Sequence, residues 1–414
     1  AVVFSSSLSR LSHFTILGFY ELVNFKGILL PGLLLIYLWT VAGNLTIIML
    51  VTFCQSLYSP MYFFLGHLSC CDLLLTTVIV PLMLDSIVRE VTITFVGCLT
   101  QFYLFGSLAA TECFILSVMS YDRYLAICQP LHYSSAMNLK RCFHLAFWCW
   151  VLAFMLMLLT AVQVGRLKFC GPNVIDHFFC DLAPLLQLSC SDTAFVEAEN
   201  LIGGLPASIL PLAFITATYI IILRAILRIP SSTGKQKAFY TCSSHLTVVC
   251  VYYGSLIVAY LFLSKGHSLS LNKVLSLLYT VLTPLLNPVI YSLRSKEIKR
   301  ALFFVFTFIY IIATYISIFI AILKIKSTMA RKKAFSTCSS HLTVFCTYYG
   351  TMISLYVTPS GRQSVKVNKT LSLLYSVVTP LLNPIIYSFR SAEIRKALAS
   401  IIFRKTGNKK VYNN

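Results

Sequence analysis

Residues 60–84 read Pro60-Met-Tyr-Phe-Phe-Leu-Gly-His-Leu-Ser-Cys-Cys-Asp-Leu-Leu-Leu-Thr-Thr-Val-Ile-Val-Pro-Leu-Met-Leu84, and Asp72 is the one charged side chain among them. A helix needs roughly 20 apolar residues to cross the hydrocarbon core of a bilayer, which is about 30 Å thick. Backbone amides cannot stay unpaired in lipid, so a crossing segment of this kind must be helical. The stretch therefore predicts a membrane-spanning helix.

The composition of the whole chain extends this prediction. Of the 414 residues, 58% are hydrophobic and 11% are charged, whereas a soluble domain carries about 25% charged residues. These figures exclude a disordered chain, a collagen and a coiled coil. The net charge of +20 marks loops on the inner face of a membrane and does not indicate a nucleic-acid partner.

Similar apolar segments recur along the chain and are too long and too uniformly apolar for barrel strands. They lie near 28–52, 60–84, 98–123, 143–163, 201–226, 239–263 and 271–293, and then near 303–325, 335–357 and 369–389. We expect an all-α membrane protein. Its parts are an extracellular segment 1–27, a seven-helix bundle 28–300, a further segment 301–398 and a basic cytoplasmic tail 399–414. The amino terminus is placed outside because most loop lysines and arginines then lie inside.

The further segment repeats an earlier one. Residues 235–300 and 331–396 align without a gap and share 40 identities in 66. The repeated unit covers the fifth, sixth and seventh spans. We therefore expect two or three additional hydrophobic helices after the bundle.

An odd number of repeated spans conflicts with the charges. If 303–325 crossed the membrane, the basic groups at 324–333 and 390–410 would face outward, against the positive-inside rule. We expect this segment to be re-entrant, interfacial or unstructured, or the chain to be a joined product of two genes. Repeats of opposite orientation also suggest a secondary transporter, but these two copies carry the same charges at the same places.

Two acids lie deep within apolar spans, where an ionised carboxylate is costly. Asp72 and Glu112 could be neutral acids that neighbouring hydroxyls satisfy. Alternatively they share a cation site for sodium, to which Asn287 and hydroxyl groups contribute, because hard cations prefer oxygen ligands.

Two further strings indicate conformational switching. Met119-Ser-Tyr-Asp-Arg-Tyr124 places Asp122 beside Arg123 at the inner end of the third span, where an ion pair can hold a helix. In Asn287-Pro-Val-Ile-Tyr291 the proline removes a helix hydrogen bond and kinks the span. Asn287, Pro288 and Tyr291 can then form an element with two states.

Four cysteines belong to the outer side. Cys98 begins the third span, and Cys170, Cys180 and Cys190 follow in the long loop before the fifth. An oxidising exterior favours two disulfides, which we assign as Cys98–Cys180 and Cys170–Cys190. A zinc site with His177 is the alternative, although the spacing matches no usual pattern.

Together these strings resemble the olfactory receptors, a branch of the rhodopsin-like G-protein-coupled receptors. The strings are Gly43-Asn44, 60–72, the one beginning at Met119, 237–246 and 284–294, and the resemblance covers about 14–300 and again about 310–398. It implies that Asp122, Arg123 and Tyr124 couple to a G protein and that Asp72 and Glu112 hold sodium. It implies no other cofactor.

The resemblance also implies an odorant pocket between the third, fifth, sixth and seventh spans. Mapped onto this sequence, the pocket is lined by Phe105, Gly106, Ala109, Ala110, Gly203, Ala207, Tyr253, Ile257, Tyr260 and Thr280. Small apolar residues with a few hydroxyls suit volatile molecules.

The resulting hypothesis is a plasma-membrane receptor, not an enzyme. It would bind small volatile organic molecules and activate a stimulatory heterotrimeric G protein, which raises cyclic AMP. The alternatives are a non-signalling product of a joined or decayed gene and a secondary transporter. One departure from the family is the repeat of the last three spans.

Overall fold

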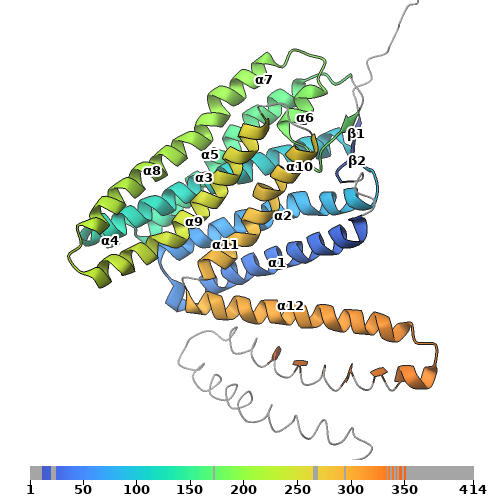
Figure 1. Ribbon diagram of the computed structural model, residues 1–414. Helices are drawn as coiled ribbons and strands as arrows, with labels where there is room; N and C mark the ends of the chain where they lie inside the picture. The colour runs from blue at the N-terminus through green and yellow to red at the C-terminus, as the bar shows by residue number, and fades with distance from the viewer. Residues whose placement is uncertain are drawn as a thin grey trace, which may run out of the picture. The chain divides into compact units, whose positions relative to one another are not determined.

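The computed structural model describes residues 12–19, 25–170, 173–263, 269–292, 295–332 and short pieces between 334 and 350. Within these residues, eight helical stretches are long and apolar enough to cross a membrane (Figure 1). They are α1 (Lys26–Phe53), α2 (Pro60–Val88), α3 (Phe95–Cys128), α5 (Leu139–Arg166), α8 (Leu205–Leu227), α9 (Ser232–Leu263), the stretch Lys273–Ser292 and α12 (Lys296–Leu323). The prediction of a helical, multi-pass membrane protein is confirmed.

Shorter elements connect these helices. They are β1 (His13–Ile16), a 3-10 turn Gln55–Leu57, β2 (Val91–Thr94), α4 (Pro130–Ala136), β3 (Val174–Ile175), α6 (Leu182–Gln187) and α7 (Ala194–Glu199). A π-helical turn Asn200–Gly204 leads into α8. The helical region that contains the Lys273–Ser292 stretch has three parts, α10 (Leu269–Leu277), a π-helical turn Leu278–Leu282 and α11 (Thr283–Ser292).

Local sequence signals explain several helix starts. Thr94 precedes α3, and its hydroxyl accepts a hydrogen bond from the Gly97 amide at 3.0 Å. Asn138 caps α5 in the same way through the Arg141 amide at 2.9 Å. A side-chain oxygen at this position satisfies an amide that the first helical turn leaves free. Pro60 occupies the first turn of α2, where its missing amide costs nothing.

The chain divides into two compact units, residues 1–305 and 306–414. In the first unit α3 is the central helix, because it packs along α2, α5 and α8 and also contacts α9. Its buried residues occur along its whole length, from Cys98 to Leu125. The outer helices present large apolar side chains instead: Ile28 of α1 is 79% exposed and Leu159 of α5 is 62% exposed. Such side chains require a lipid environment.

A three-stranded sheet lies at the end of the bundle where α3 begins. β1 pairs antiparallel with β2, with Phe14 opposite Ile93, and parallel with β3, with Ile16 opposite Ile175. Phe14 and Ile16 are fully buried. Gly18 follows with a positive φ of 53°, and a side chain there would collide with Ser86. The part of 1–27 that the structure describes thus contains a strand that the sequence analysis did not predict.

α12 runs without a break from Lys296 to Leu323 (Figure 1). A continuous helix contradicts two of the predictions for 303–325, because the segment is neither unstructured nor re-entrant up to Leu323. Its length and apolar composition make it a candidate span. The prediction that it lies at the membrane interface stays a prediction, and the described pieces beyond it end at 350.

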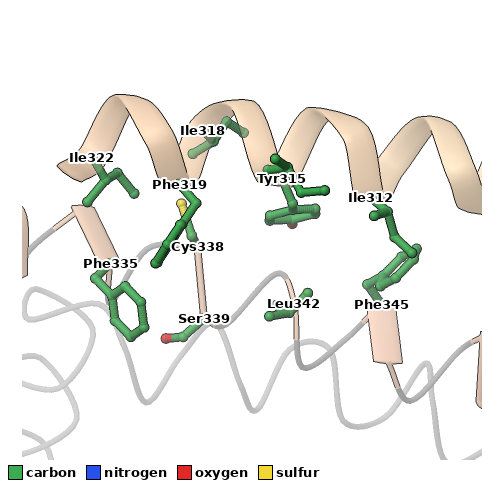
Figure 2. Close-up of a pocket in the computed structure, with 11 residues that line it drawn as sticks. Ile312, Tyr315, Ile318, Phe319, Ile322, Phe335, Cys338, Ser339, Leu342 and Phe345 are labelled. Atoms are coloured by element: carbon green, nitrogen blue, oxygen red, sulfur yellow. The ribbon is translucent and has the colours of Figure 1, made fainter. Parts of the chain in front are cut away.

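Within the second unit, α12 and the pieces between 334 and 350 form an apolar pocket of about 310 Å³. Figure 2 shows Phe319 and Ile322 of α12 extending toward the segment that carries Phe335 and Cys338. Ile318, Ile322 and Cys338 all line the pocket. At an offset of 96 residues these positions correspond to Ile222, Ile226 and Cys242. In the first unit those three are buried against Tyr124, Ile127 and Cys128 of α3. The apolar face that packs against α3 in the first copy therefore lines a pocket in the second copy.

Candidate functional site

The first unit contains a partly open cavity of about 900 Å³. Its walls come from α3, α5, α7, the π-helical turn before α8, α8 itself, α9 and the turn after α10. Eight predicted pocket residues line it: Phe105, Gly106, Ala109, Ala110, Gly203, Ala207, Tyr253 and Ile257. The small residues of α3 that the sequence analysis selected therefore line a cavity in the structure.

Two predicted pocket residues fall elsewhere. The side chain of Tyr260 lies outside the described residues. Thr280 is wrong as a lining residue: it is fully buried and its hydroxyl donates to the Ser276 carbonyl at 2.7 Å. The π-helical turn rotates this part of the seventh span, and the preceding residue, Tyr279, lines the cavity instead.

The sequence analysis missed the wall formed by α5 and α7. Leu156, Met157 and Thr160 of α5 and Phe195 and Glu199 of α7 line the cavity. Sequence offered one weak signal, since Glu199 is an acid directly before an apolar span. The contribution of α5 depends on how closely α3 approaches it, and a side-chain carbon at Gly106 would collide with Met157.

Polar groups are few in this cavity. The Thr160 hydroxyl donates to Glu199 Oε1 at 3.0 Å. The Tyr252 hydroxyl donates to the Ala109 carbonyl at 2.9 Å and contacts Cys113 Sγ at 3.3 Å. The hydroxyl of Tyr253 is buried and has no hydrogen-bond partner among the described residues. Such a cavity can hold a small, mainly apolar molecule and orient it with a few hydrogen bonds.

Near the carboxyl end of α3 the structure brings Asp122 and Arg123 together as a buried ion pair. The hydroxyl of Tyr133 on α4 donates to Asp122 Oδ1 at 2.8 Å. Tyr124 points elsewhere, packing against Ile222 and Ile226 of α8. Asp122 thus has a partner from its own helix and one from α4, and Tyr133 was not predicted as part of this site.

A second polar cluster lies within the bundle. Asn287 Nδ2 donates to both carboxylate oxygens of Asp72, at 3.1 and 2.9 Å, and Glu112 lies within hydrogen-bonding reach of Asp72. Buried Glu112 Oε1 and Asn287 Oδ1 have no hydrogen-bond partner among the described residues. Oxygen atoms of this kind are the ligands that a hard monovalent cation takes.

α11 connects this cluster to α1. Asn44 Nδ2 donates to the Pro284 carbonyl at 3.1 Å. Pro288 packs so closely on Gly43 that a Cβ there would lie 3.2 Å from the proline ring. Tyr291, one turn further, is buried. The predicted switch residues Asn287, Pro288 and Tyr291 therefore lie on one short helix held by both α1 and α2.

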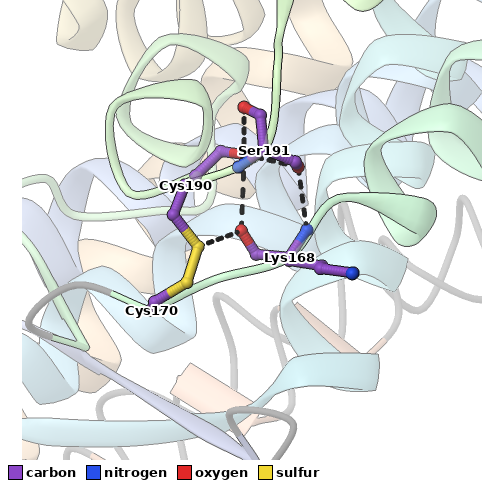
Figure 3. Close-up of a disulfide and its surroundings, with 5 residues drawn as sticks. Lys168, Cys170, Cys190 and Ser191 are labelled. Atoms are coloured by element: carbon purple, nitrogen blue, oxygen red, sulfur yellow. Dashed lines mark hydrogen bonds between the residues drawn. A yellow bond between two sulfur atoms is a disulfide. The ribbon is translucent and has the colours of Figure 1, made fainter. Parts of the chain in front are cut away.

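Two disulfides tie the outer loop. Cys98 is joined to Cys180 and Cys170 to Cys190, with Cα–Cα distances of 5.5 and 5.8 Å. Figure 3 shows the second disulfide beside Lys168, whose carbonyl accepts a hydrogen bond from the Cys190 amide at 2.9 Å. Because these cysteines are bonded to each other, the zinc alternative is wrong. The described residues contain no group of three or more His, Cys, Asp or Glu side chains placed to hold a metal.

An ion pair joins the outer loop to the seventh span. Lys273 is buried, contacts Asp176 and donates to the Gly18 carbonyl at 2.9 Å. The adjacent His177 ring stacks on Phe178 with centroids 4.6 Å apart. Burial, and then the nearby Lys273 charge, lower the pKa of His177 to about 4. The imidazole is therefore neutral at neutral pH.

The first unit is thus a helical bundle with a mainly apolar cavity among four long helices, a buried polar cluster and a buried ion pair near the carboxyl end of α3. The family model described as "Olfactory receptor" matches residues 33–307 and, a second time, 301–405. Human olfactory receptor 11A1 is 43% identical over 300 residues, which are 72% of this chain and 95% of that protein. Human olfactory receptor 6N1 is 45% identical over 294 residues, 71% of this chain and 94% of that protein.

The chain belongs to the olfactory receptor family. It is thus an odorant-sensing G-protein-coupled receptor and not an enzyme. The membership also argues against the transporter alternative. The second match begins within α12 and covers the repeated segment.

Proposed function

We propose that this receptor binds a small volatile organic molecule in the cavity of about 900 Å³ and activates a stimulatory heterotrimeric G protein, which raises cyclic AMP. The cavity is the observation that carries the proposal, because it is large, mainly apolar and placed among four of the long helices. The receptor acts in the plasma membrane with its amino terminus outside. In that orientation the disulfide-bonded loop and the sheet face the extracellular side.

α9 provides a route from the cavity to the inner face. Tyr252, Tyr253 and Ile257 of this helix line the cavity, while Cys242 packs at the inner end near Tyr124. A helix rises 1.5 Å per residue, so Tyr253 and Cys242 are separated by roughly 16 Å on one rigid element. A ligand shifts the balance between two positions of α9 only by its difference in affinity for them.

The inner switch is the Asp122–Arg123 pair with Tyr133. In the inactive state the pair is closed, and the Tyr133 hydroxyl satisfies the second carboxylate oxygen. Outward movement of α9 opens the face of α3 at Tyr124. Arg123 is then free to leave Asp122 and to contact the G protein.

The second polar cluster would hold a sodium ion in the inactive state. Asp72 and Glu112 would supply carboxylate oxygens, and Asn287 would supply its free amide oxygen. The bound ion would offset the charge of these buried carboxylates. Movement of α11 at Pro288 changes the place of Asn287 and so weakens the site.

The test is the Arg123→Ala variant in transfected cells, challenged with an odorant panel while cyclic AMP is recorded. We expect the odorant response to be abolished at unchanged surface staining, because the inner switch is lost. The control is Lys140→Ala, which removes an exposed basic residue near the start of α5. A full response from Arg123→Ala at normal surface expression would contradict the mechanism.

The repeat favours a second candidate, a non-signalling product of a joined or decayed gene. The observation behind it is the second family match at 301–405. Sequencing the transcript distinguishes the two. A message that ends soon after Arg300 restores an ordinary receptor, and a message that encodes all 414 residues keeps the repeat in the product.

A further inference from the structure

The cavity contains an acidic group that is incompletely satisfied. Glu199 ends α7 and lines the cavity. The Thr160 hydroxyl donates to its Oε1 at 3.0 Å. Its second oxygen, Oε2, is buried and has no hydrogen-bond partner among the described residues. A buried carboxylate oxygen without a donor is costly, so a donor from outside the protein would be bound strongly here.

The described lining of the cavity offers Glu199 no counter-charge. The described residues that line the cavity include no Lys, Arg or His. Coulomb attraction is much stronger in an apolar cavity than in water. A ligand that carries its own positive charge would therefore compensate Glu199 and gain affinity that a neutral ligand lacks.

The surroundings of Glu199 suit an organic cation. Phe195 lies one helical turn before Glu199 on α7, and both line the cavity. Residues four apart share a helix face, so an ammonium group at Glu199 also lies near an aromatic ring, which attracts cations. The part of the lining that α3 contributes is apolar, with Phe105, Ala109 and Ala110.

We propose that the odorants of this receptor are small amines, whose protonated nitrogen pairs with Glu199 while the hydrocarbon part fills the α3 side of the cavity. This inference rests on the proposed function and specifies its ligand class. An alkylamine has the same chemistry as a lysine side chain, with a pKa near 10.4, so it is charged at neutral pH. Thr160 acts as a positioning residue because its hydroxyl orients the carboxylate.

The experiment compares matched odorants on the full chain in transfected cells. The probes are hexylamine with hexanol, and cyclohexylamine with cyclohexanol, so that each pair differs only in the polar group. Cyclic AMP dose–response curves are recorded for the wild type, Glu199→Gln and Thr160→Val, with surface staining for each. The control variant is Glu197→Gln, which changes an exposed acid on the same helix that accepts a hydrogen bond from the Thr193 hydroxyl at 2.7 Å.

We expect the wild type to respond to each amine at lower concentrations than to its alcohol. Glu199→Gln should raise the half-maximal amine concentration by roughly 10- to 100-fold, the range for a lost charged hydrogen bond, and leave the alcohol response little changed. Thr160→Val should give a smaller shift in the same direction. Glu197→Gln should behave as the wild type.

Three outcomes would overturn the inference. One is equal potency of amines and alcohols on the wild type, and another is an amine preference that survives Glu199→Gln. A response to the alcohols alone refutes the amine class while leaving odorant sensing intact. Silence toward every probe from a surface-expressed wild type would count against the proposed function itself.

Discussion

Replacing Tyr133 by phenylalanine removes one hydroxyl group from the inner switch, which consists of Asp122, Arg123 and Tyr133. The Tyr133 hydroxyl donates to Asp122 Oδ1 at 2.8 Å, and Asp122 is fully buried. Phenylalanine keeps the ring and removes the donor. The carboxylate then keeps Arg123 and loses its contact with α4, so the substitution destabilises the closed pair and leaves its charge unchanged.

The size of the effect follows from the geometry. A hydrogen bond to a charged acceptor contributes about 1.5–3 kcal/mol, and Tyr133 is half-buried, which favours the lower value. A difference of 1.4 kcal/mol is a factor of ten in an equilibrium constant. If the bond exists only in the inactive state, an active fraction of about 1% in the absence of odorant becomes about 10%.

The assay is basal cyclic AMP in transfected cells without odorant, divided by surface staining. We expect Tyr133→Phe to raise this ratio roughly tenfold. Tyr121→Phe is the control. It removes the same hydroxyl group from the tyrosine that directly precedes Asp122 on α3, and Tyr121 is 36% exposed. An unchanged or lower basal signal from Tyr133→Phe at normal surface level would refute the assignment of this bond to the inactive state.

Three further predictions concern the sodium site, the outer loop and the repeat. Purified wild-type receptor should melt a few degrees higher in sodium chloride than in choline chloride, because the ion binds the folded state; Asp72→Asn should remove the difference, and an equal difference in both would contradict the site. Since the pKa of His177 is lowered to about 4 from its ordinary value of about 6.5, the neutral ring contributes stability above pH 6.5 that is lost as the pH falls through 4. Between pH 6.5 and 4 this loss amounts to at most about 3 kcal/mol in the free energy of unfolding. His177→Phe should therefore show a smaller fall in melting temperature over this pH range than the wild type. An equal fall in both would show that the histidine does not contribute. Asn368, which lies outside the described residues, begins an Asn-Lys-Thr sequon and should carry a glycan if 303–325 does not cross the membrane; a glycosidase shift that Asn368→Gln leaves intact would show that the glycan lies elsewhere.

The amino-acid sequence by itself determined the class of fold and the place of most spans. This was possible because lipid imposes a simple rule on sequence: about 20 apolar residues for each crossing, as in 60–84. Asp122, Arg123, Asn287 and the four outer cysteines were also identifiable, since a polar residue in such a context requires a partner.

Only the tertiary structure decided which side chains meet. Glu199 and Thr160 lie on different helices, and no local pattern shows that they share a hydrogen bond in the cavity. Tyr133 reaches Asp122 because α4 packs against α3, and the π-helical turn at Leu278–Leu282 puts Tyr279 where Thr280 was expected. The physical reason is that periodicity reports whether a residue is apolar and on which helix face it lies, whereas pairing across helices depends on the rotation and approach of two packed elements.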